Sequence, residues 1–209
     1  MRPMKLVCFA VKEEAGAFQR LVGAKAGVSV LVTGMGRKNA ADAVRTFLQQ
    51  HPAEVVFTCG FAGGLAPALP PGAVVFHTDA EKLATALRAA GASPAKIHCA
   101  DRVAVTAVQK TQLRAATGAG VVEMESEAIQ NVCREMSIPC ATVRVISDSA
   151  TEDLPVDFNR LYRADMSLDF GKLLWTIARS PGKIGGLRRL QKRCRMAAGK
   201  LAAVLVQVT

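Results

Sequence analysis

The chain has 209 residues, a length that suits a single domain with a sizeable buried core. Half of the residues are hydrophobic and the mean hydropathy is +0.22, which excludes a disordered composition. No apolar run approaches the roughly 20 residues that span a bilayer. The apolar run at 7–11 leads into charge rather than into a cleavage site, so we expect a cytoplasmic protein without a signal peptide.

The formal net charge of +10 is concentrated at one end of the chain. Residues 159–209 contain 11 Lys and Arg against two Asp, a net charge of +9, so the remainder of the chain is close to neutral. We therefore divide the chain into a domain at 1–156 and a basic helical extension at 157–209 that packs on the domain or continues it.

Cysteine and histidine spacing points to no metal chemistry. The six cysteines include no CxxC pair, and the three histidines show no ligand spacing. Buried reduced thiols are the favoured interpretation, because most of the cysteines lie among apolar residues. We expect no metal and no cofactor.

Strand-like and helix-like segments alternate along the first 91 residues. Short apolar runs bounded by charge or glycine predict strands at 5–11, 28–36, 53–65 and 73–76. Apolar residues at helical spacing predict helices at 13–23, 38–50 and 80–91.

The alternation continues to residue 148. Residues 95–100 and 103–108 are strand-like, 125–136 form an amphipathic helix, and 138–148 form a strand that ends in a polar dipeptide. This order predicts an α/β fold in one domain, with a mixed, mostly parallel sheet flanked by helices. In such sheets, ligands bind beyond the carboxyl ends of the strands.

Polar or glycine-rich groups follow the predicted strands. They are Glu13 and Glu14, Thr33 to Gly36, Gly60 to Gly64, Ser147 and Asp148, and the acidic segment VVEMESEAI at 121–129. Each has an alternative structural interpretation: glycines as turns, acids as helix N-termini, and Asp148 as an N-cap. Their convergence on one edge of one sheet favours a functional site.

The order of these motifs resembles the nucleoside phosphorylase and nucleosidase superfamily, particularly the nucleosidases that act on methylthioadenosine and S-adenosylhomocysteine. The resemblance is carried by MKLVCFAVKEEAGAF (4–18), TGMGRKNAADAV (33–44), TCGFAGGLAPALPPGAVV (58–75) and VVEMESEAIQNVCREMSIPCATVRVISDSA (121–150). It covers about half of the chain. The most specific part is E-M-E followed about twenty residues later by R-x-I-S-D.

The resemblance implies a nucleoside phosphorylase-like fold and roles for two acids on the base and the sugar. Asp148 matches the general acid that protonates the purine at N7, and Ser147 is expected to orient it. Glu125 matches the carboxylate that binds the ribose hydroxyls, with Met124 packed beneath the sugar.

The remaining implied roles concern the nucleophile and the pocket walls. Glu14 matches the glutamate that activates the attacking water, although a one-residue gap leaves Glu13 as an alternative. The resemblance places Gly34, Gly36, Gly63 and Gly64 around a water or phosphate pocket, and Arg102, Val103 and Ala104 near the base. For Arg144, a structural ion pair with a glutamate of 123–127 is favoured over phosphate binding.

The chain departs from the family's pattern in two places. Phe61 stands where the family has Ser or Thr, which counts against phosphorolysis. The segment 77–120 is about half of the expected length, and we find no aromatic stacking residue at 99–106. We therefore expect a more open site that suits a bulkier substrate.

The basic tail predicts helices with apolar residues at Leu173, Leu174, Ile177, Leu187 and Leu190. A solvated helical face is the favoured interpretation, and a contact with anionic lipid at the inner face of a membrane is the alternative. The tail and the short middle segment also resemble hopanoid-associated members of the superfamily, whose substrate is a lipid-linked nucleoside.

Together, the sequence predicts an enzyme that cleaves the N-glycosidic bond of a purine, adenosine-type nucleoside. Hydrolysis is favoured over phosphorolysis, so phosphate stays open as a second substrate. The alternative is a catalytically degenerate protein of the same fold that binds a nucleoside or a lipid. Nucleic acid is not expected as a partner, since stacking aromatics are scarce. The superfamily often forms homodimers, and a homodimer is one option here.

Overall fold

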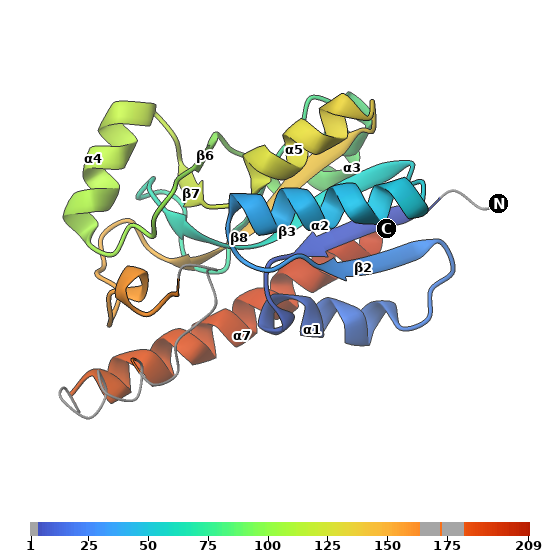
Figure 1. Cartoon of the computed structure of the whole chain (residues 1–209). Coiled ribbons are helices and arrows are strands. Elements are labelled where there is room, and N and C mark those ends of the chain that lie inside the picture. The colour runs from blue at the N-terminus through green and yellow to red at the C-terminus, as the bar shows by residue number, and fades with distance from the viewer. Residues whose placement is uncertain (1–3, 164–171, 173–181) are drawn as a thin grey trace.

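The computed structural model describes residues 4–163, 172 and 182–209, and within them one eight-stranded sheet lies between helices (Figure 1). The strands are β1 (Lys5–Phe9), β2 (Val28–Val32), β3 (Val55–Gly64), β4 (Val74–His77), β5 (Ser93–Pro94), β6 (Ile97–Cys99), β7 (Val121–Glu123) and β8 (Cys140–Asp148). The helices are α1 (Lys12–Val22), α2 (Arg37–Gln50), α3 (Glu81–Ala89), α4 (Ala107–Thr117), α5 (Ser126–Glu135) and α7 (Lys183–Val208), with a short 3₁₀ helix at Phe158–Arg160.

The sheet is mixed and mostly parallel, which confirms the predicted fold class. Its main path runs β2-β1-β3-β8-β4-β5, and β1, β2, β3 and β8 are mutually parallel. β4 runs antiparallel to β8, and the short β7 pairs antiparallel with the end of β3. The carboxyl ends of β1, β3 and β8 therefore lie along one edge of the sheet.

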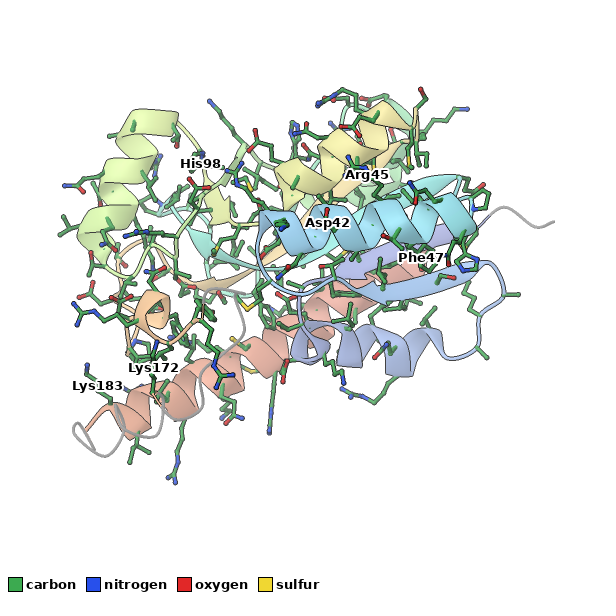
Figure 2. The ribbon with its side chains drawn as sticks, in the orientation of Figure 1. Asp42, Arg45, Phe47, His98, Lys172 and Lys183 are labelled. Carbon is green, nitrogen blue, oxygen red and sulfur yellow. The ribbon has the colours of Figure 1, made fainter. Side chains whose placement is uncertain are left out.

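Helices cover both faces of the sheet. α2 and α5 lie side by side on one face, where Leu6 and Val56 of the strands pack against Val44 and Ile129. Arg45, labelled in Figure 2, pairs with Glu135 across these two helices at 2.7 Å. α1 and α7 cover the opposite face (Figure 1).

The second half of α7 belongs to the hydrophobic core. Ala198, Leu201, Ala202 and Leu205 are buried at spacings of one helical turn, in contact with a cluster that includes Phe18 of α1. The basic residues gather in the first half of the helix, so the tail combines a buried apolar end with a charged end. The expected apolar positions Leu173, Leu174 and Ile177 lie outside the described residues.

The prediction of a strand at 103–108 was wrong. Thr106 is instead the N-cap of α4, and its hydroxyl accepts a hydrogen bond from the backbone N–H of Gln109 at 3.2 Å. The Gln109 side chain in turn accepts from the N–H of Thr106, which completes a capping box. Alternating small and β-branched residues mimic a strand here, but the cap sets the helix start.

The segment 77–120 thus contains α3, the short strands β5 and β6, and α4. Among the described residues, no helix combines the length and the hydrophobicity needed to cross a membrane.

Candidate active site

A cavity of about 270 Å³ opens where β1, β3, β7 and β8 end. Carboxyl groups from three separate elements face it: Glu14 of α1, Glu125 at the start of α5, and Asp148 at the end of β8. The walls are largely apolar, and their members include Val11, Met35, Phe61, Val103, Ala104, Val122, Met124, Leu154, Phe158, Tyr162, Leu190 and Cys194.

Glu14 is buried in the first turn of α1, and backbone groups hold both of its oxygens. Oε1 accepts from the N–H of Phe61 at 2.8 Å, and Oε2 accepts from Ala10 and Val11 at 3.1 and 3.3 Å. Burial raises its pKa to about 7, against the opposing effect of the Phe61 hydrogen bond. Because the folded chain retains this proton at a higher pH than the unfolded chain, the group lowers stability as pH rises from about 4.5 to 7.

Gly60 leaves the space that the Glu14 carboxylate occupies. A Cβ at this position would lie 2.6 Å from Glu14 Oε1, closer than any non-bonded contact allows. Gly60 therefore allows the carboxyl group of Glu14, 46 positions earlier in the sequence, to lie against β3. Any side chain at position 60 would displace that carboxyl group.

Glu125 is anchored by the glycine-rich turn that follows β2. Its Oε1 accepts a hydrogen bond from the backbone N–H of Gly36 at 3.0 Å. Gly36 has φ 86°, in the left-handed region that favours glycine, and this conformation aims the N–H at the acid. Burial raises the pKa of Glu125, and the Gly36 hydrogen bond opposes that shift.

A buried ion pair lies behind the glutamates. Arg144 Nη2 is 2.6 Å from Glu123 Oε2, and both side chains are at most 3% exposed. Arg144 also donates to the backbone oxygen of Thr58 at 2.7 Å. Burial opposes the charge on Arg144, but Glu123, Glu125 and Glu14 together outweigh it and raise the pKa of Arg144. For Glu123, burial favours the neutral acid, yet Arg144 and the hydrogen bonds from Ser126 and Glu125 together outweigh it and lower the pKa of Glu123. The ion pair expected for Arg144 is therefore present.

A second, much smaller cavity lies between these charged groups. Its volume is about 10 Å³, and it is lined by Glu14, Thr33, Thr58, Glu125 and Arg144 together with neighbouring strand residues. That volume is about the space of one water molecule, and several polar groups face it.

Asp148 is held at both of its carboxylate oxygens. Ser147 donates its hydroxyl to Oδ1 at 2.6 Å. Lys110 donates its ammonium to Oδ2, also at 2.6 Å, from the middle of α4. Sequence reasoning missed Lys110 because it did not find α4. The T-x-x-Q pattern at Thr106 to Gln109 was the available signal.

The structure brings most of the predicted site residues to one place. Met124, Gly63, Arg102, Val103 and Ala104 line the larger cavity. Gly34 and Gly64 lie outside the lining of both cavities described above. Glu13, the alternative to Glu14, is exposed to solvent. The roles assigned to these residues stay predictions.

Two of the three aromatic residues that line the cavity come from a segment that the sequence did not point to. Phe61 belongs to β3, and Phe158 and Tyr162 belong to the segment after β8. Burial raises the pKa of Tyr162 to about 12. Leu190 and Cys194 of α7 complete the wall, so the basic tail takes part in forming the cavity. In the described part of the chain, no three His, Cys, Asp or Glu side chains are grouped to hold a metal ion.

Fold and site together define an α/β protein with an acid-lined ligand cavity at the carboxyl ends of its parallel strands. A family model described as "Phosphorylase superfamily" matches residues 9–98 and 82–178. The chain belongs to this superfamily.

Relatives in sequence are nucleosidases. The chain is 27% identical to a 5′-methylthioadenosine/S-adenosylhomocysteine nucleosidase of Shewanella halifaxensis, in an alignment that covers 66% of this chain and 76% of the relative. It is also 27% identical to the corresponding nucleosidase of Anoxybacillus flavithermus, with 65% and 73% covered.

Solved structures share the fold. A 5′-methylthioadenosine/S-adenosylhomocysteine nucleosidase from Neisseria meningitidis, in complex with methylthio-immucillin-A, has a TM-score of 0.74 at 19% identity and covers 98% of this chain and 97% of its own. Native futalosine hydrolase of Helicobacter pylori has a TM-score of 0.69 at 15% identity, with 98% and 97% covered.

The buried ion pair yields a prediction about stability. Arg144→Met removes one partner and leaves Glu123 as an uncompensated buried charge, so we expect the free energy of unfolding to fall by about 3–5 kcal/mol. Urea denaturation followed by circular dichroism measures the change. The control is Arg45→Met, which breaks an exposed pair and should cost less than about 1 kcal/mol. Equal losses for the two variants would contradict the importance of the buried pair.

Proposed function

We propose that the protein is an enzyme that hydrolyses the N-glycosidic bond of a purine nucleoside. The observation that carries this proposal is the convergence of Glu14, Glu125 and Asp148 on one cavity from three elements. Membership of the phosphorylase superfamily and the nucleosidase relatives support an enzyme that cleaves N-glycosyl bonds.

The arrangement supplies the groups that this reaction needs. Cleavage passes through a cation-like sugar, and it requires protonation of the leaving base, anchoring of the sugar and a positioned nucleophile. Asp148 acts on the base, Glu125 accepts hydrogen bonds from ribose hydroxyls above Met124, and Glu14 takes a proton from the attacking water. A base with a pKa of about 7 suits proton removal near neutral pH.

The small cavity favours water over phosphate as the nucleophile. It lies next to Glu14 and Arg144 and has room for about one water molecule, whereas a phosphate ion carries four oxygen atoms. Phe61 also belongs to its lining and stands where the family has Ser or Thr, so this position supplies no hydroxyl group for phosphate oxygens. Hydrolysis is therefore favoured over phosphorolysis.

Aromatic and aliphatic side chains favour a flat, largely apolar base in the larger cavity. Phe61, Phe158 and Tyr162 supply ring faces and edges, and Val103 with Ala104 adds apolar surface. The further apolar residues Leu154 and Leu190 give room for an apolar substituent, which supports a lipid-linked nucleoside of the hopanoid-associated kind as one substrate. A homodimer stays a prediction.

A degenerate binding protein is the competing function, and release of the free base decides between the two. We expect wild-type protein to release purine from methylthioadenosine at equal rates with and without inorganic phosphate. Asp148→Asn should lower kcat by a hundredfold or more while ligand binding, measured by calorimetry, persists. No base release from any purine nucleoside would overturn the enzyme proposal, and strict dependence on phosphate would overturn hydrolysis.

Glu14 predicts the pH dependence of the reaction. A general base must be ionised, so kcat/KM should rise about tenfold per pH unit below pH 7 and level off above it. Glu14→Gln should remove this acidic limb and lower kcat by a hundredfold or more. Glu13→Gln is the matched control, because its exposed carboxyl lies outside the cavity. An unchanged acidic limb in Glu14→Gln would contradict the role of Glu14 as the base.

We also propose that the first half of α7 contacts an anionic membrane surface. Lys183, Arg188, Arg189, Lys192 and Arg195 are exposed there, and α7 has no acid in its first turn. Lys183, labelled in Figure 2, marks the end of α7 that projects away from α1. Each basic residue near an anionic surface contributes about 1 kcal/mol.

Vesicle co-sedimentation tests this contact. Binding to vesicles that contain phosphatidylserine should weaken with salt and should fall at least tenfold in the triple variant Arg188→Gln/Arg189→Gln/Lys192→Gln. The matched control neutralises the exposed residues Lys25, Lys38 and Lys82 on other elements and should bind like wild type. Equal binding to neutral vesicles, or equal loss in the control, would contradict the proposal.

A further inference from the structure

Lys110 is a buried lysine whose charge is fully satisfied by the candidate site. Its side chain is 0% exposed, although it lies in the middle of a helix on the periphery of the fold. The ammonium donates to Asp148 Oδ2 at 2.6 Å, to the backbone oxygen of Ser149 at 2.7 Å and to that of Glu152 at 2.9 Å. These three bonds use all of its donors.

Burial of an ammonium group costs free energy, so a buried lysine is expected to have a role other than packing. A buried cation persists only where a carboxylate and further acceptors compensate for lost hydration. Here the carboxylate is Asp148, the acid proposed to act on the leaving base. The two carbonyl acceptors belong to the loop that follows it, at 149–152.

Asp148 cannot be treated as an isolated carboxylic acid in this setting. Oδ1 accepts from the Ser147 hydroxyl and Oδ2 accepts from an ammonium, the pattern of an ionised carboxylate. Protonation of a leaving base requires a proton that such a carboxylate does not itself hold. The nearest charged donor bonded to it is Lys110.

We propose that Lys110 is the positioning residue that supplies the proton for departure of the base, and that it acts through Asp148. This inference rests on the proposed nucleosidase function. As the bond between C1′ and the base breaks, its electron pair passes to the base. The base takes a proton from Asp148, and Asp148 takes one from the Lys110 ammonium. The lysine is left as a neutral amine and regains a proton from water.

The loop and α7 keep this pair in place. Glu152, whose carbonyl oxygen accepts from Lys110, has its side chain held by Arg193 of α7 through two bonds of 2.7 and 2.8 Å. Charged and titratable groups surround the pair on three sides. The loop contributes Glu152 and Asp153, and Asp153 accepts from the N–H of Ala107 at the start of α4. The others are Arg193 and Cys194 of α7, and Glu14, Glu125 and Tyr162 in the cavity. Burial raises the pKa of Cys194 to about 11.

Two variants of Lys110 separate proton supply from simple support of the fold. In Lys110→Met, no ammonium remains to supply the proton, so purine release should fall near neutral pH and recover in part at lower pH, where solvent protons are more abundant. We expect the alkaline limb of kcat/KM to move at least one pH unit toward acid relative to wild type.

In Lys110→Arg, the charge remains but the guanidinium does not release its proton. Purine release should then fall about a hundredfold at every pH.

A substrate whose leaving group needs no proton provides the decisive comparison. In 4-nitrophenyl β-D-ribofuranoside, the leaving group departs as 4-nitrophenolate and needs no proton. Both variants should therefore hydrolyse this substrate within about tenfold of the wild-type rate. Lys96→Met is the matched control, since Lys96 is exposed and donates only to the carbonyl of Thr117. Thermal unfolding of each variant verifies that it is folded.

The outcomes distinguish the inference from the function on which it rests. If Lys110→Met lowers hydrolysis of both substrates equally with no shift of the alkaline limb, Lys110 has only a structural role. Full activity of Lys110→Arg would likewise overturn proton supply. If wild type releases no purine base from any nucleoside, the proposed function fails and not the inference alone.

Discussion

The site depends on the buried guanidinium of Arg144, which lies close to three glutamates. It pairs with Glu123 directly and favours the ionised forms of Glu14 and Glu125 through space. Without it, three carboxyl groups would be buried close to one another with no compensating charge. β8 places this residue four positions before Asp148, so one strand supplies both this cation and a carboxyl group that faces the cavity.

The position of Arg144 explains why the segment at 121–129 contains three glutamates. Glu123 points inward to Arg144 and also accepts the hydroxyl of Ser126, which ties β7 to α5. Glu125 turns to the cavity, and Glu127 faces outward to pair with Arg37 at 2.7 Å. The three carboxylates therefore lie in three different places: Glu123 in the core, Glu125 at the cavity and Glu127 on the surface.

Sequence patterns predicted the sheet and the acids well, because both depend on local signals. Apolar runs that end in glycine or acid identified β1, β2, β3 and β8, and their carboxyl ends predicted the convergence of Glu14, Glu125 and Asp148. The missed features are long-range. Lys110 looks like an ordinary surface lysine in sequence, since nothing local indicates that its neighbour in space is 38 positions away. Phe158 and Tyr162 were missed for the same reason, because a wall formed by a segment after the last strand leaves no periodic pattern.

The middle segment 77–120 and the basic tail lie far apart in sequence, but the structure brings both to the region of Asp148 and Glu152. Lys110 of α4, within the segment 77–120, donates a hydrogen bond to Asp148. Arg193 of α7 donates to the side chain of Glu152, in the loop that follows Asp148. Glu14 and Asp148 lie in different environments within the cavity. Burial raises the pKa of Glu14 to about 7, although its carboxyl group accepts hydrogen bonds from backbone N–H groups that oppose this shift. Asp148 instead accepts from an ammonium and a hydroxyl. Two carboxyl groups in contrasting environments can take opposite roles in one reaction, one removing a proton from water and the other passing a proton to the base.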